Sequence, residues 1–73
     1  MTALQIAFAR ANAAWMTAQT AYLNAAETAA NKPTAQNWAA ADSAFQTQQN
    51  ASAAADRAAQ AMRNEAYTAA HAE

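Results

Sequence analysis

The sequence contains no cysteine and no glycine, and it has a single histidine. Without cysteine the chain can form neither a disulfide nor a thiolate metal site, and one histidine cannot build a metal cage alone. Without glycine it lacks the residue from which phosphate-cradling loops are made. We therefore expect neither a cofactor nor a metal.

Charge and long apolar runs are also scarce. The chain has four basic and five acidic residues, too few and too balanced for the basic surface that nucleic-acid binding requires. It has no apolar run of about 18 residues, and residues 1–10 show no secretory pattern. These absences predict no nucleic-acid partner, no membrane span, and a cytoplasmic or virion setting.

Alanine is what the chain has in excess, at 28 of its 73 residues. Alanine is the best helix former and loses no side-chain entropy on burial. A chain this short buries only about 60% of its unfolded surface, so packing or association must supply stability that no disulfide or metal can add. We expect a single all-α domain over residues 1–73.

One segment interrupts the helical pattern. Pro33 lacks a backbone donor and disfavours helix at the preceding residue, and Thr34 can cap a helix that begins after it. Thr2 and Gln5 have the spacing of a capping box at the start of the chain. The sequence therefore predicts a first helix over about 3–30, a turn over 31–34 and a second helix over about 35–71.

Both helices carry a seven-residue repeat of the kind found in coiled coils. If the chain folds back at the turn, its five aromatic rings in this repeat face small residues of the opposite helix. The expected pairs are Phe8 with Ala55 and Ala59, Trp15 with Ala51 and Ser52, Tyr22 with Ala41 and Ala44, Trp38 with Ala25 and Ala29, and Phe45 with Ala18 and Ala21. This pattern predicts an antiparallel two-helix hairpin, an alanine-rich coiled coil with its rings wedged between close backbones.

The first helix has apolar side chains left over on its other side. Ile6, Met16 and Leu23 lie there with alanines, and Arg10 and Glu27 are the only charged residues of this helix. Burying each of the three large side chains would contribute about 1.5 to 3 kcal/mol. We interpret this side as a partner-binding surface that completes a helical bundle with a second copy or within a larger complex.

The second helix is expected to extend past the first. Its end is either a frayed tail or a contact arm in which Tyr67 anchors against a partner, and we count Tyr67 among the candidate partner-binding residues. His71 lies nearby without a serine, cysteine or carboxylate in a recognisable catalytic arrangement. We therefore expect no catalytic residue and no enzymatic activity.

Two classes of function fit these features. The first is a structural or assembly protein that self-associates or packs onto a larger complex, and small size with alanine-rich helices suggests a phage or virion accessory component. The second is a small inhibitor or adaptor that presents a helix face to a target protein.

A third interpretation comes from a resemblance. Thr17 and Thr28 are eleven residues apart in an alanine-rich helix, which resembles the type I antifreeze proteins. Ala39 and Asn50 stand where the pattern would require further threonines, and neither aromatic rings nor a proline turn are expected in such helices. A thermal hysteresis measurement would test the antifreeze activity that this resemblance implies.

Overall fold

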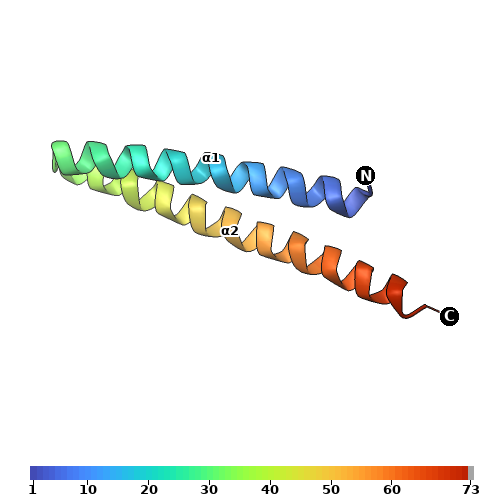
Figure 1. Ribbon diagram of the computed structural model, residues 1–73. Coiled ribbons are helices and arrows are strands. Elements are labelled where there is room, and N and C mark those ends of the chain that lie inside the picture. Colours follow the sequence, from blue (N-terminus) through green and yellow to red (C-terminus); the bar gives the residue numbers. More distant parts are fainter. Residues whose placement is uncertain (73) are drawn as a thin grey trace.

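A computed structural model of the protein describes residues 1–72, which form two long α-helices joined by a short turn (Figure 1). Helix α1 spans Ala3–Asn31 and helix α2 spans Ala35–Ala70, so α1 ends one residue later than expected and α2 one residue earlier. The two helices pack against each other in opposite directions, which confirms the predicted all-α hairpin.

The hairpin is a rod and not a compact domain. Its principal extents are 61 × 16 × 12 Å. Its radius of gyration is 16.9 Å, against about 11 Å for a compact domain of this length. A molecule of this shape presents most of its side chains to solvent.

Side-chain hydrogen bonds fix the start of both helices. The backbone N–H of Gln5 donates to Thr2 Oγ1 at 3.1 Å and the backbone N–H of Thr2 donates to Gln5 Oε1 at 2.8 Å, so the expected capping box is present. The backbone N–H of Asn37 donates to Thr34 Oγ1 at 3.1 Å at the start of α2. Asn37 Nδ2 also donates to the carbonyl oxygen of Lys32 at 2.8 Å, which ties the turn to the second helix.

The turn is made without a left-handed residue. Lys32 has φ −137° and ψ 88°, outside the helical region that the following Pro33 disfavours. No residue within 1–72 has a positive φ. The chain therefore reverses without glycine by combining a non-helical Lys32, Pro33 and the capping Thr34.

The tightly packed interior consists of methyl groups. Ala18, Ala29 and Ala41 are the buried hydrophobic residues of the described chain. The rings of Phe8 and Trp15 are only half-buried. The residues with the least exposed surface are therefore alanines, and the aromatic rings are more exposed than they are.

The contact stripe of α1 is the one that the seven-residue repeat predicts. Its less exposed residues recur at spacings of three and four: Leu4, Phe8, Ala11, Trp15, Ala18, Tyr22, Ala25 and Ala29. On α2 one row of the repeat is in the stripe as predicted, namely Ala41, Gln48, Ala55 and Met62. The other predicted row is only partly buried, at Ser52 and Ala59, and the adjoining row Asn37, Ala44, Ala51 and Ala58 is less exposed than Trp38 and Phe45. Phe8 and Trp15 of α1 line one groove with Ser52, Ala55 and Ala59 of α2, which are among the small residues expected opposite them.

The rings of α2 lie at the edge of the interface, which differs from the prediction. Trp38 is 48% exposed and Phe45 is 40% exposed, and Phe45 contacts the ring of Tyr22 at 5.4 Å between centroids and 60° between planes. Ala21, the expected neighbour of Phe45, is exposed. Because alanine allows close approach, α2 turns its methyl stripe toward α1 and leaves its own rings on the flank.

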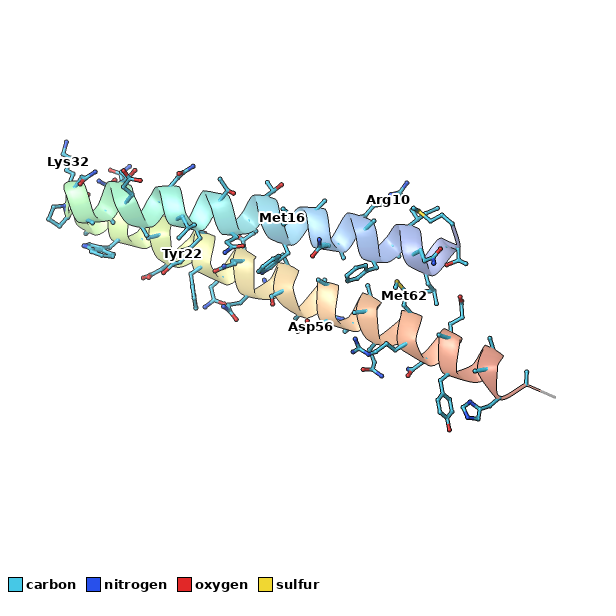
Figure 2. The ribbon with its side chains drawn as sticks, in the orientation of Figure 1. Arg10, Met16, Tyr22, Lys32, Asp56 and Met62 are labelled. Carbon is cyan, nitrogen blue, oxygen red and sulfur yellow. The ribbon has the colours of Figure 1, made fainter. Side chains whose placement is uncertain are left out.

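The helices separate toward the two termini (Figure 1). Ala29 and Ala41 are buried near the turn. At the other end of the hairpin, every described residue from Arg63 onward is exposed. Near the open end Met62 points from α2 toward α1, while Arg10 points away from α2 (Figure 2). The half of the hairpin near the termini is therefore less tightly closed than the half near the turn.

Candidate docking face

A groove opens between the helices in the less closed half of the hairpin. Its volume is about 320 Å³. Residues of both helices line it: Phe8, Asn12, Trp15, Ser52, Ala55, Asp56 and Ala59. The rings of Phe8 and Trp15 are thus accessible from this groove, although they belong to the contact stripe of α1.

The groove exists because one row of α2 changes from large to small side chains. At seven-residue spacing this row runs Trp38, Phe45, Ser52 and Ala59, and residues seven apart lie on one side of a helix. Near the turn its two rings cover the side of the interface. Toward the termini Ser52 and Ala59 are too small to do so, which leaves the groove open.

Two of the predicted partner-binding residues border the same side. Asn12 lines the groove, and its Nδ2 lies 3.8 Å from the Sδ of Met16 one turn further along α1. Leu23 follows Met16 by seven residues and so shares its row. We call the side formed by the groove, Trp38, Phe45, Met16 and Leu23 the grooved face.

The structure leaves all four predicted partner-binding residues accessible. Ile6 is 37%, Met16 56%, Leu23 57% and Tyr67 67% exposed. Met16 and Leu23 belong to the grooved face, whereas Ile6 lies one row further around α1. Whether these residues bind a partner stays a prediction.

Tyr67 lies apart from the others on the end of α2. Its ring stacks on that of His71, with 4.1 Å between centroids and 26° between planes. Nδ1 of His71 lies 2.8 Å from the carbonyl oxygen of Tyr67. The two rings therefore form a small cluster of their own on an exposed part of the helix.

Trp38 and Phe45 are surface residues that the sequence pattern did not reveal. The pattern favours the interior for both, because large side chains usually mark the seam of a coiled coil. The signal that could have corrected this is the pair of small residues, Ser52 and Ala59, that continues their row.

The side chains of the grooved face are mostly apolar. The groove is lined mainly by aromatic and methyl carbon, and its polar residues are Asn12, Ser52 and Asp56. Over residues 1–72, no three side chains of histidine, cysteine, aspartate or glutamate come close enough together to hold a metal ion. Neither α1 nor α2 is long and apolar enough to cross a membrane.

Comparison with known protein families, curated proteins and solved structures found no match. The functional interpretation therefore depends on the shape and chemistry of the grooved face.

Proposed function

We propose that this protein is a non-enzymatic structural or assembly protein that contributes two helices to a larger helical bundle. The second copy or larger complex that supplies the other helices covers the grooved face. An accessory component of a phage or virion is one setting that suits so small a helical module.

The observation that carries this proposal is the excess of exposed surface. The chain exposes 5339 Å², whereas a compact monomer of 7.6 kDa exposes about 4,300 Å². The difference, roughly 1,000 Å², is comparable with the area of about 800 Å² that each partner buries in a stable interface.

The identity of the exposed side chains supports the same proposal. Met16, Leu23, Trp38 and Phe45 are large and apolar, and between 40% and 57% of each is exposed. Full burial of a large apolar side chain contributes about 1.5 to 3 kcal/mol, so covering the exposed part of each would contribute roughly half of that. Among residues 1–72 the buried hydrophobic residues of the hairpin are all alanines. Association is therefore expected to supply a large share of the stability of the folded chain.

Substitutions on the grooved face test the proposal. We expect Met16→Glu and Leu23→Glu to reduce the solution mass measured by light scattering at fixed concentration, because an unpaired charge would be buried at the contact. Thr17→Glu is the matched control, since Thr17 adjoins Met16 and is exposed outside the grooved face. Unchanged mass, folding and partner binding in both face variants would show that the face is not used.

An adaptor or inhibitor is the second candidate function. The groove, with Phe8 and Trp15 accessible at its side, has the apolar character of sites that receive a helix from a target protein. A chain that stays monomeric at all concentrations, yet binds a different protein through Met16 and Leu23, would favour this function over self-assembly.

A further inference from the structure

We propose that a second copy of this chain covers the grooved face, with Trp38 and Phe45 of each copy seated in the groove of the other. This inference rests on the proposed assembly function and adds the identity of the partner and the geometry of the contact. It predicts a symmetric dimer with four helices.

The levels of the rings and of the groove along the rod support this geometry. Tyr22 and Phe45 are in contact and therefore lie at one level of the hairpin. One heptad toward the termini, Trp15 and Ser52 lie level with each other and both line the groove. On the grooved face, the exposed rings of α2 thus lie nearer the turn, and the groove begins one heptad further toward the termini.

The pattern is complementary to itself under a twofold rotation. The proposed twofold axis lies at the level of Gln19 and Gln48. It runs perpendicular to the rod, within the plane of contact between the two copies, so the second hairpin points in the opposite direction to the first. This rotation brings Phe45 of one copy to the level of Trp15 in the other, and Trp38 to the level of Phe8. Both rings then meet a groove that has room for them because Ser52 and Ala59 are small.

The available area fits a dimer of this kind. Isologous contacts bury the same patch on both copies, so one grooved face supplies both halves of the interface. The surface in excess of a compact monomer, roughly 1,000 Å², exceeds the area of about 800 Å² that one partner contributes to a standard interface. This contact would cover four of the large apolar side chains that the hairpin leaves exposed: Met16, Leu23, Trp38 and Phe45.

Filling the groove from within the same chain tests the ring-in-groove contact. In Ala59→Phe a new ring would occupy the groove, so we expect the dimer to weaken about tenfold or more although the apolar surface has grown. Circular dichroism should show the helical hairpin intact. Ala40→Phe is the control: Ala40 is exposed on α2 and, two residues after Trp38, lies on nearly the opposite side of the helix from the ring row, so this variant should dimerise like the natural chain.

A cysteine cross-link tests the register directly, because the chain has no cysteine of its own. Gln49 is exposed next to Gln48, so the proposed axis places Gln49 beside its own copy in the partner. We expect mild oxidation to join Gln49→Cys chains into covalent dimers and to leave Gln60→Cys, further along α2, mostly unjoined. A dimeric protein in which Gln60→Cys cross-links and Gln49→Cys does not would overturn the register.

The two proposals fail in different ways. If Met16→Glu lowers the mass but Ala59→Phe does not, the assembly function stands and the ring-in-groove dimer is wrong. If the natural chain is monomeric at every concentration, the proposed dimer is wrong and the assembly function then depends on binding to a larger complex. Loss of the dimer in Ala59→Phe, with the hairpin intact and Ala40→Phe unaffected, supports the inference.

Discussion

At the scale of single residues, the hairpin depends on the smallest apolar side chain. Ala29 has no exposed surface and Ala41 is almost fully buried, while no larger side chain among residues 1–72 reaches that state. A methyl group lets two backbones approach closely and loses no rotamer entropy on burial. The contact near the turn is therefore close and intolerant of added volume.

We predict that Ala29 does not tolerate a larger side chain, whereas the adjacent Ala30 does. Ala29→Leu should lower the free energy of unfolding by about 1 to 3 kcal/mol, because the added carbons have no space between the helices. Ala30→Leu should change it by less than about 0.5 kcal/mol, since Ala30 is exposed on the same turn of α1. Urea unfolding followed by circular dichroism measures both values, and equal effects at the two positions would contradict a methyl-packed contact.

At the scale of the elements, local capping chemistry determines where each helix begins. Thr34 caps α2 through the backbone N–H of Asn37, and the Asn37 side chain holds the carbonyl of Lys32 in the turn. We predict that Thr34→Ala lowers the free energy of unfolding by about 0.5 to 2 kcal/mol.

The same substitution within a helix provides the control. Thr17 lies in the middle of α1 and is exposed, so Thr17→Ala should leave stability unchanged or raise it slightly, because alanine has the higher helix propensity. Thermal unfolding of both variants at one protein concentration compares them. Destabilisation by Thr17→Ala as large as that by Thr34→Ala would show that the cap is not the cause.

The elements also show how far the sequence alone determines the structure. Pro33, Thr34 and the Thr2 capping box are local signals, and they placed both helices to within one residue at the ends that differed. The rotation of α2 about its axis is not local. It follows from the packing of two whole helices. Because an alanine-rich helix has several faces of similar apolar character, the positions of Trp38 and Phe45 led to the wrong prediction of which face of α2 contacts α1.

The candidate site was predictable in the same partial way. Met16 and Leu23 could be identified because they lie outside the contact stripe of a single helix. The groove could not, because it forms only when the small residues Ser52 and Ala59 of α2 come to lie beside Phe8 and Trp15 of α1. A site formed by two helices can be predicted only when their relative rotation is known. The seven-residue repeat did not determine that rotation.

At the scale of the whole molecule, the protein is a thin rod whose accessible surface is larger than that of a compact monomer of the same mass. Small domains are marginally stable because little of their surface is buried, and this shape lowers the buried fraction further. Covering the grooved face would therefore couple folding to association. Such coupling makes the stability of the chain depend on its concentration.

The melting temperature as a function of protein concentration tests this coupling most directly. We predict that a hundredfold increase in concentration raises the melting temperature of the natural chain by roughly 5 to 10 °C, as linked folding and association require. The Met16→Glu and Leu23→Glu double variant should melt at a temperature that does not change with concentration. A natural chain whose melting temperature is equally independent of concentration would contradict the claim that self-association through the grooved face stabilises the fold.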